Sequence, residues 1–595
     1  TALCFMLFGR HVNRYYLKYL YLFIAGIVTL LVVDYAQLEI PVIYRKVLTA
    51  INSGFIDEAR TVAFTADVFT KEVFLPLIVI IAIMLVGRFL WRLCFFGAGE
   101  GTIDGLRREM FDNARTLSQQ FYSRNKVGGL MSLFTNDLAT IEECMGWGVL
   151  MFFDATFLGT LATVRMFSVQ PILALFCMIP MALLAVIGAI INKYMMLRWE
   201  VKEQAFSNIS DYTQESFVGL AVIKAFVRQA HRALDFKKLN VENERANVAF
   251  TRLSVLLKVT VTLFVESVIG VILGVGGYLV HEGGFSAEAL IEFLGYFSSV
   301  VWPIMAISEL VDMTARGRAS LKRVSALIDD KTKLVDKSGA TDAERLSGEI
   351  EIKNLTFSYP DGGRVILNDV SFKINAGESV GVVGRIGAGK TTLVDLLTRT
   401  YDVPDGTIFV DNTDVNALTV KSVRENIAYV PQDNFLFSDT IKNNIAFSVG
   451  DASDEAVVAA AKLSCVHDEI AGFERGYDTV LGERGVTVSG GQKQRISIAR
   501  AIIKDAPVMI LDDSLSAVDA ETEKVLLHNI FSARKGKTTI LIAHRISTVR
   551  ALDKILFLDG GRVVGFDSHL DLLASCPDYA RLSKLQDLEK GGALL

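Results

Sequence analysis

Long apolar runs occupy the first half of the chain, whereas the second half alternates short apolar and polar segments. Six of the runs approach the roughly 20 residues that a helix needs to cross about 30 Å of hydrocarbon. They lie near residues 17–41, 73–97, 147–168, 171–193, 254–280 and 288–312. This pattern predicts an all-α, six-helix membrane domain over residues 1–320. Only residues 169–171 separate the third and fourth runs, which predicts a tight membrane hairpin.

The polar stretches between the runs predict orientation. Residues 101–145 and 193–252 are rich in Lys and Arg, which favour the cytoplasmic side of a membrane. Both stretches are helical in pattern, so we expect the membrane helices to continue as long cytoplasmic extensions; soluble subdomains are the alternative. We therefore expect a multi-pass protein of the cell (plasma or inner) membrane, with both termini and the C-terminal domain in the cytoplasm.

The pattern changes after residue 320. Residues 321–349 are charged and are interpreted as a linker. From residue 350 onward short β-rich runs alternate with helical segments, which predicts an α/β nucleotide-binding domain over residues 350–588. The expected strands cover residues 350–357, 365–374, 379–383, 427–430, 508–511, 538–542 and 554–558.

Composition narrows the function classes. The chain has 595 residues, 51% of them hydrophobic, and a formal net charge of −5. This near-neutral charge gives no attraction to polyanions, so no nucleic-acid partner is expected. The six cysteines lie far apart without a C-x-x-C pair, so they predict neither a disulfide framework nor a zinc site.

The strongest chemical signal is a G-x-x-x-x-G-K-T motif between a predicted strand and a predicted helix over 391–397. In such a P-loop the backbone N–H groups surround phosphates, the lysine reaches the β and γ phosphates, and the threonine hydroxyl ligates Mg²⁺. ATP and Mg²⁺ are therefore the expected cofactors. The residues assigned to the nucleotide are Gly384, Arg385, Ile386, Gly387, Ala388, Gly389, Lys390, Thr391 and Thr392.

A metal-binding carboxylate is expected at the end of a buried strand, and Asp512 follows the apolar run 508–511. The alternative is that Asp512 and Asp513 are only a solvated pair at a strand end.

Residues 488–492, Val-Ser-Gly-Gly-Gln, resemble the L-S-G-G-Q signature of the ATP-binding cassette (ABC) transporters. Nearly the whole chain resembles their half-size exporters, in which six membrane helices precede one cassette. The resemblance implies a second anion site at a helix N-terminus, which closes over ATP bound to the opposite cassette. Its residues here are Ser489, Gly490, Gly491 and Gln492.

Other motifs carry further implied roles. Tyr359 resembles the aromatic residue that stacks on adenine, with a core strand tyrosine as the alternative. Gln432 resembles the glutamine that contacts Mg²⁺ and the attacking water, and His544 resembles the histidine that contacts the γ phosphate. Residues 516–519 resemble the loop between the two cassettes, and residues 479–485 resemble an exporter loop. Residues 121–131 and 210–221 resemble the coupling helices that seat on cassettes, the second commonly on the partner's.

One departure concerns the catalytic base. Most active cassettes have Glu directly after the metal-binding Asp, whereas this chain has Asp513, shorter by one methylene. A base must lie within hydrogen-bond reach of its water, and a misplacement of about 1 Å can cost on the order of a hundredfold. The chain thus resembles the degenerate-site subunit of heterodimeric bacterial multidrug exporters, which pairs with a homologous half-transporter and hydrolyses ATP slowly at its own site. The alternatives are a homodimer with Asp513 as base, or an ATP-gated or regulatory membrane protein that does not pump.

The sequence says less about the transported compound. An ionisable side chain is costly to place in the hydrocarbon of a membrane, so each one inside a span is a candidate functional residue. Here they are Asp34, Arg88, Arg92, Asp154, Arg165 and Glu266. Glu266 is the candidate contact for a cationic or polar group of the substrate, with an interhelix hydrogen bond as the alternative. The 37 phenylalanines suit hydrophobic or amphipathic compounds, multidrug or lipid-like.

Overall fold

The computed structural model describes residues 9–56, 61–125, 127–331, 334–343, 345–360, 362–482 and 488–592. The chain divides into two compact units. The first unit comprises Thr1–Arg115 and Val127–Asp330, and the second comprises Thr116–Lys126 and Lys331–Leu595.

The described part of the first unit is built of helices, apart from turns and one isolated bridge between Phe55 and Ala63. The described residues contain six helical segments that are long and apolar enough to cross a membrane, which agrees with the predicted spans. The unit's elements are α1 (Arg10–Lys18), α2 (Leu20–Leu38), α3 (Ile40–Ser53), α4 (Ala66–Phe69), a π-helical turn (Thr70–Phe74), α5 (Leu75–Ala114), α7 (Val127–Ser132), a second π turn (Leu133–Asp137), α8 (Leu138–Glu143), a third π turn (Cys144–Gly148), α9 (Val149–Val169), α10 (Pro171–Val218), α11 (Leu220–Ala225), α12 (Gln229–His281) and α13 (Ala287–Asp329).

Local sequence explains where two of these helices break. Gln170 is extended (φ −154°) between α9 and α10, and Pro171 starts α10 at a position where its missing N–H costs nothing. This is the tight hairpin that the sequence predicted. The first predicted span is divided at Glu39, because Pro41 lies in the first turn of α3.

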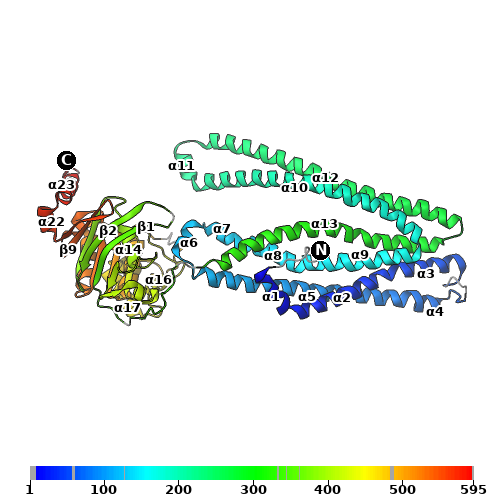
Figure 1. Ribbon diagram of the computed structural model, residues 1–595, viewed down its shortest axis with the longest axis horizontal. Coiled ribbons are helices and arrows are strands. Elements are labelled where there is room, and N and C mark those ends of the chain that lie inside the picture. The colour runs from blue at the N-terminus through cyan, green and yellow to red at the C-terminus, as the bar shows by residue number, and fades with distance from the viewer. Residues whose placement is uncertain are drawn as a thin grey trace. The chain divides into compact units, whose positions relative to one another are not determined.

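The longest helices exceed the thickness of a membrane. α12 has 53 residues and α10 has 48, so they extend for roughly 70–80 Å at 1.5 Å per residue. The polar stretches between the spans are thus helix extensions rather than soluble subdomains. α10 and α12 run side by side and are joined through α11, while α2, α5, α9 and α13 pack on one another (Figure 1).

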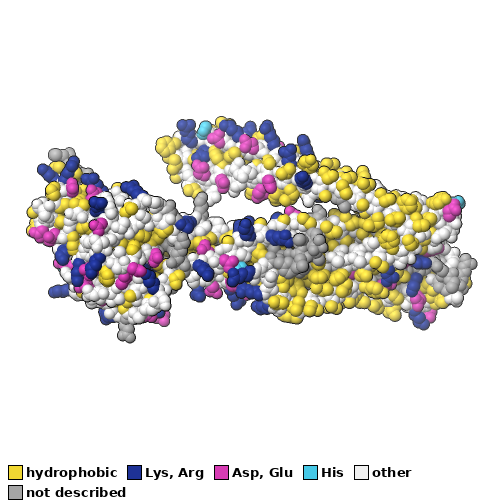
Figure 2. All heavy atoms as spheres, in the orientation of Figure 1, with side chains coloured by type: hydrophobic (Ala, Val, Ile, Leu, Met, Phe, Trp, Pro, Cys, Tyr) yellow, Lys and Arg dark blue, Asp and Glu magenta, His cyan; other side chains and the backbone are white. Residues whose placement is uncertain are grey.

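The bundle is apolar both inside and outside. Buried side chains such as Leu158, Ile272 and Phe293 form a core between the helices. Figure 2 shows a broad hydrophobic surface over the same helices, which is the exterior expected of a unit surrounded by lipid.

The second unit is the α/β domain that the sequence predicted. Its strands form a six-stranded sheet of order β10-β9-β3-β8-β7-β6 and a four-stranded antiparallel sheet of order β2-β1-β4-β5. The strands are β1 (Ile350–Ser358), β2 (Val365–Ile374), β3 (Ser379–Gly384), β4 (Ile408–Val410), β5 (Thr413–Asp414), β6 (Ile427–Val430), β7 (Val508–Asp512), β8 (Thr538–Ile542), β9 (Lys554–Asp559) and β10 (Arg562–Asp567). All seven expected strands are present, whereas β4, β5 and β10 were not anticipated.

The parallel part of the large sheet is largely buried. β7 and β8 are buried along their whole length and β3 is buried after its first residue, as expected for a sheet covered on both faces. The helices of this unit are α6 (Gln119–Arg124), α14 (Lys390–Leu397), α15 (Val420–Glu425), α16 (Ile441–Ala446), α17 (Asp454–Leu463), α18 (His467–Ala471), α19 (Gly490–Ile503), α20 (Ala520–Ala533), α21 (Ile546–Val549), α22 (His569–Ser575) and α23 (Pro577–Gly592).

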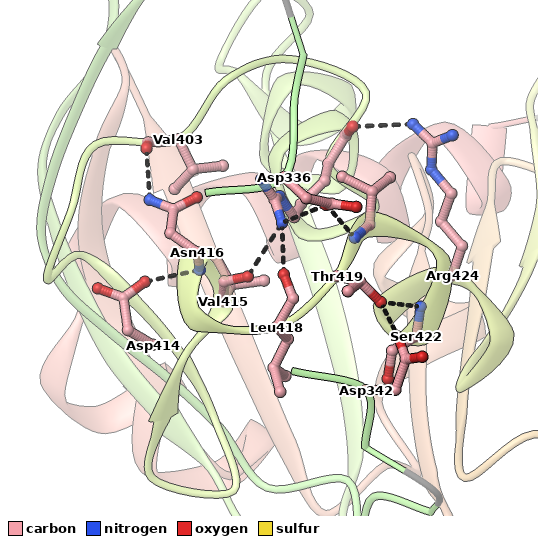
Figure 3. Close-up of polar contacts among 12 residues, drawn as sticks. Asp336, Asp342, Val403, Asp414, Val415, Asn416, Leu418, Thr419, Ser422 and Arg424 are labelled. Atoms are coloured by element: carbon pink, nitrogen blue, oxygen red, sulfur yellow. Dashed lines mark hydrogen bonds and ion pairs between the residues drawn. The ribbon is translucent and has the colours of Figure 1, made fainter. Parts of the chain in front are cut away.

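Residues that follow α13 are bound to the α/β domain (Figure 3). The Asp336 carboxylate accepts the backbone N–H of Val420 at 2.7 Å and lies 3.9 Å from the Arg399 guanidinium. Arg399 is 1% exposed and donates to the carbonyls of Val415 and Leu418. Part of the charged segment 321–349 is therefore fixed to the domain surface.

Candidate functional site

Four neighbouring parallel strands, β3, β8, β7 and β6, end at one edge of the large sheet. The P-loop follows β3, Asp512 ends β7, His544 follows β8, and Gln432 follows β6. Ligands of open α/β sheets bind at the carboxyl ends of such strands. The fold therefore brings these predicted residues to a common edge.

Glycines give the P-loop its path. Gly387 and Gly389 have φ of +80° and +96°, a region that other residues rarely adopt. A Cβ at Gly384 would lie 2.2 Å from the carbonyl oxygen of Leu558, so the end of β3 also requires glycine. The remaining loop residues continue directly into α14, whose N-terminal N–H groups suit an anion.

Lys390 lies at the start of α14 and is buried. Its ammonium donates to the carbonyls of Gly384 at 2.9 Å and Arg385 at 3.2 Å, so it is held within the loop. Burial lowers the pKa of Lys390, and the nearby carboxylates of Asp512 and Asp513 oppose that shift. Because burial disfavours the charged ammonium, a bound anion would stabilise it, so this lysine is suited to a phosphate.

Asp512 has the properties expected of a metal ligand. It is 2% exposed, and its Oδ2 has no hydrogen-bond partner among the residues that the structure describes. Burial raises the pKa of Asp512, while a hydrogen bond from Thr391 opposes the rise. A buried carboxylate oxygen beside a threonine hydroxyl fits the oxygen donors that Mg²⁺ prefers. Mg²⁺ there would neutralise phosphate charge.

Asp513 and His544 lie near each other. Their Oδ2 and Nε2 atoms are 3.9 Å apart. The backbone of Asp513 is left-handed (φ +44°), and its N–H donates to the Ile542 carbonyl at 3.1 Å. This main-chain bond fixes the carboxylate at the strand end, so its reach depends on its own side-chain length.

Two other predicted residues have different surroundings. The hydroxyl of Tyr359 is 2.8 Å from Thr392 Oγ1 on α14, and its ring packs edge-on against Tyr401 and Phe357. Tyr359 thus reaches the P-loop helix from the antiparallel sheet. Gln432 is exposed in the loop after β6.

The signature residues form a helix start. Ser489 caps α19: its Oγ accepts the N–H of Gln492, and the Gln492 side chain accepts the N–H of Ser489. A Cβ at Gly491 would lie 2.9 Å from the Ala517 carbonyl oxygen, so glycine allows a close approach to the 516–519 loop. Of the predicted exporter loop 479–485, residues 483–485 lie outside the described part of the chain.

Sequence reasoning missed Gln494. Its amide donates to Ser516 Oγ at 3.2 Å and accepts the N–H of Ala517 at 3.0 Å. Ser516 in turn donates to the Asp513 carbonyl at 3.1 Å. These bonds connect α19 to the loop after β7, and a polar residue on the buried face of α19 was the available signal.

Gln586 was also missed. From α23 its amide donates to the His544 carbonyl and accepts the Ile546 N–H, both at 2.8 Å. It therefore positions the loop that carries His544, across a sequence separation that no local pattern reveals.

Comparisons with known proteins agree with this geometry. Residues 23–304 match the ABC transporter transmembrane region, and residues 367–516 match the ABC transporter model. The chain is 33% identical to the probable multidrug resistance ABC transporter ATP-binding/permease protein YheI of Bacillus subtilis (strain 168), over 98% of each chain. The chain belongs to the ABC transporter family.

Two further relatives refine this assignment. The multidrug resistance-like ATP-binding protein MdlA of Escherichia coli (strain K12) is 31% identical, over 95% of this chain and 94% of that protein. The structure of a bacterial Atm1-family ABC exporter with ATP bound superposes with a TM-score of 0.76 at 26% identity, covering 97% of this chain and 98% of that one. The chain is thus a half-size ABC exporter, a multi-pass membrane protein with an ATP-hydrolysing cassette.

The two candidate coupling segments of this exporter differ. Of the predicted segment 121–131, residues 121–125 belong to the unit that contains the cassette, whereas residues 127–131 belong to the helical unit. Around α11, by contrast, the apolar side chains of Phe217, Val218 and Phe226 are largely exposed within this chain.

The ionisable residues in the exporter's spans fall into three groups. Arg165 pairs with Glu39 at 2.7 Å. Asp34, Arg88, Arg92 and Asp154 line one cavity, and Glu266 lies exposed on α12 in an open hollow with Lys258 and Thr262.

Proposed function

We propose that this ABC exporter moves hydrophobic or amphipathic compounds, multidrug or lipid-like, out of the cell as one subunit of a heterodimer. Its partner is a homologous half-transporter, and its own P-loop site is slow. The observation that carries the proposal is Asp513 at the position of the catalytic glutamate, held by the main-chain bond to Ile542. The relatives named for multidrug resistance support the substrate class.

In this proposal the chain's residues divide between two ATP sites. The P-loop residues, Thr391 and Asp512 hold one nucleotide with Mg²⁺, Tyr359 contacts its base, and Gln432 and His544 contact the metal and the γ phosphate. Ser489 to Gln492 close over ATP bound to the partner, where a glutamate acts as base. The helix start at Ser489 supports this second role. The capping box bonds the N–H groups of Ser489 and Gln492, and it leaves those of Gly490 and Gly491 at the positive end of α19 for an anion.

Transport follows from the nucleotide's different affinity for two states. ATP draws the cassettes together and opens the bundle outward; hydrolysis and release reset it. The grouping of residues 121–125 with the cassette supports the role of segment 121–131 as the first coupling helix. The exposed apolar side chains around α11 support the proposal that the second coupling segment, residues 210–221, seats on the partner's cassette. The protein lies in the cell membrane with its cassette and both termini in the cytoplasm.

A homodimer with Asp513 as base is the second candidate. It is favoured by the 3.9 Å separation of Asp513 and His544, which leaves the carboxylate beside a group that contacts the γ phosphate in this scheme.

Glu266 is the proposed contact for a cationic group of the cargo. We expect Glu266→Gln to lower ATP-driven uptake of a cationic dye into inside-out vesicles severalfold while basal ATPase stays unchanged, because only the substrate loses a charge partner. Glu244→Gln on the same helix is the matched control. Equal dye uptake by wild type and Glu266→Gln would contradict the role of Glu266, and no ATP-dependent uptake of any amphipathic dye would contradict export.

A further inference from the structure

A cavity of about 300 Å³ lies within the first unit between α2, α5, α9 and α13, together with the π turn before α9. This volume is at the lower end of the roughly 300–1,000 Å³ typical of small-molecule pockets. The cavity is separate from Glu266, which lies on α12. Its lining combines two carboxyl groups with three of the four tryptophans of the chain, Trp91, Trp147 and Trp302.

The two carboxyl groups come from different helices and line the same cavity. Asp34 lies on α2 and Asp154 lies on α9. The Trp302 indole donates to Asp154 Oδ2 at 2.6 Å and so fixes that carboxyl. The Ser298 and Ser299 hydroxyls donate to their own helix backbone, so they present only lone pairs to the cavity. The wall is therefore rich in acceptors.

Two buried polar atoms of this wall are unsatisfied. Asp34 is 2% exposed and Trp91 is 7% exposed. Asp34 Oδ2 and Trp91 Nε1 have no hydrogen-bond partner within the described ranges of the chain. Because buried polar groups in folded proteins are nearly always paired, the two atoms indicate an occupant of the cavity. Asp34 Oδ2 is the atom that can face a cation, whereas Trp91 Nε1 is a donor and would need an acceptor.

The charged residues around the cavity also include two arginines, both from α5. The Arg88 guanidinium donates to Gln37 Oε1 at 3.2 Å, and the Arg92 guanidinium lies 5.2 Å from the centre of the Trp91 ring. α9 contributes Asp154 and α2 contributes Asp34, while the cavity residues of α13 are uncharged. Arg88 is thus the resident cation beside the acidic pair, bonded to an amide rather than to either carboxylate.

We propose that this cavity binds an organic ammonium ion, whose charge lies against Asp34 and Asp154 and whose apolar body packs on the tryptophan rings. Carboxylates supply charge, and indole faces attract cations more strongly than other side-chain rings. The ligand replaces Arg88 as counter-ion of the acidic pair. All the residues named here come from one chain. This inference gives the proposed export function a ligand chemistry, but binding is testable without transport.

The tryptophan distribution provides a direct probe of binding. The fourth tryptophan, Trp199, lies on α10 against Phe250 and outside the cavity. In a Trp199→Phe background the intrinsic fluorescence of the purified full-length chain reports only the cavity. The ligands are phenyltrimethylammonium and its uncharged carbon isostere tert-butylbenzene.

We expect phenyltrimethylammonium to change the emission saturably and tert-butylbenzene to bind at least tenfold more weakly. Asp34→Asn and Asp154→Asn each weaken phenyltrimethylammonium binding tenfold or more, whereas Asp104→Asn, an exposed carboxylate of α5 paired with Arg108, leaves it unchanged. Arg88→Gln tightens binding severalfold, because it removes the competing cation. A gain of affinity cannot result from misfolding, so this variant keeps the test decisive.

Equal affinity for the two ligands, or unchanged affinity in both aspartate variants, would overturn the inference. Saturable, aspartate-dependent binding in a protein that shows no ATP-driven dye uptake would leave the inference standing and contradict the proposed function instead.

Discussion

The cassette contains two anion-binding regions that differ in how completely they are built. In the P-loop region the lysine, the metal-binding carboxylate and the histidine loop all meet, but the base position carries a short Asp513. In the signature region the helix cap at Ser489 is satisfied in both directions by Gln492. In our proposal the first region holds a nucleotide but cleaves it slowly, and the second completes the site of a partner.

The carboxyl groups of the two regions also differ in their electrostatic surroundings. The P-loop region gathers buried carboxyls: burial and the charge of Asp512 raise the pKa of Asp395 to about 6. In the signature region the backbone N–H of Thr522 lowers the pKa of Asp519, the cap of α20. Burial disfavours the charged form of Asp395 in the first region, and a cation would stabilise that form, whereas backbone N–H groups already stabilise the charged form of Asp519 in the second. The hydrogen bonds from Gln494 through Ser516 to Asp513 connect the two.

The largest effect is expected from Ser489→Arg. It removes the cap and places a long side chain where N–H groups face the partner's phosphates, so ATPase of the assembled heterodimer should fall on the order of a hundredfold. Steady-state phosphate release measures this, and binding of a fluorescent ATP analogue to this chain's P-loop is the unchanged control. Retention of more than half the activity would show that the signature region does not complete a working site.

A smaller effect is expected from changing the base position. Asp513→Asn should alter total ATPase of the heterodimer less than twofold, whereas Asp513→Glu should speed cleavage at this chain's own site by about tenfold or more, because the longer side chain reaches the water. Single-turnover hydrolysis, with the partner's site inactivated, separates the two sites. Loss of turnover in Asp513→Asn would instead identify Asp513 as a working base.

The smallest effect concerns pH and stability. The folded-state pKa of Asp395 lies above its ordinary value, so its protonated form favours folding, and that stability is lost as pH rises from about 4 to about 6. Asp395→Asn should therefore raise cassette stability at pH 7 by on the order of 1 kcal/mol, allowing for solvent screening of a half-buried group, and have little effect near pH 4. Calorimetry of the full-length protein at both pH values tests this.

Asp519→Asn is the contrasting control for that experiment. The lowered pKa of Asp519 means that its contribution is present above its ordinary pKa and lost as pH falls, so the variant should be less stable at pH 7. If the stability changes of the two variants depended on pH in the same way, the proposed electrostatic difference between the two regions would be wrong.

Much of this architecture was predictable because its signals are local. The P-loop glycines, the buried runs of β3 and β7 and the apolar spans each occupy a continuous segment. Short strands are harder, because β4 has three residues and β5 has two, too few for any periodicity. β10 was missed although Gly560 and Gly561 before it were an available hairpin signal.

The parts that escaped prediction depend on tertiary contacts. Gln586 reaches the His544 loop from the C-terminal helix, and the Asp34–Asp154 cavity draws on helices separated by more than a hundred residues. Listing ionisable residues in the spans identified its members but could not show that they face one another. Spacing along one helix cannot reveal a site that four helices build together.

The central claim is that the P-loop region of this chain holds ATP while its signature region serves a partner. The most direct test is the ATPase rate and oligomeric state of the chain purified alone, and again with a homologous half-transporter encoded beside it. The account predicts turnover only with the neighbour, abolished by replacing the neighbour's glutamate with Gln and little changed by Asp513→Asn. A stable homodimer that hydrolyses ATP alone, and that Asp513→Asn inactivates, would contradict it.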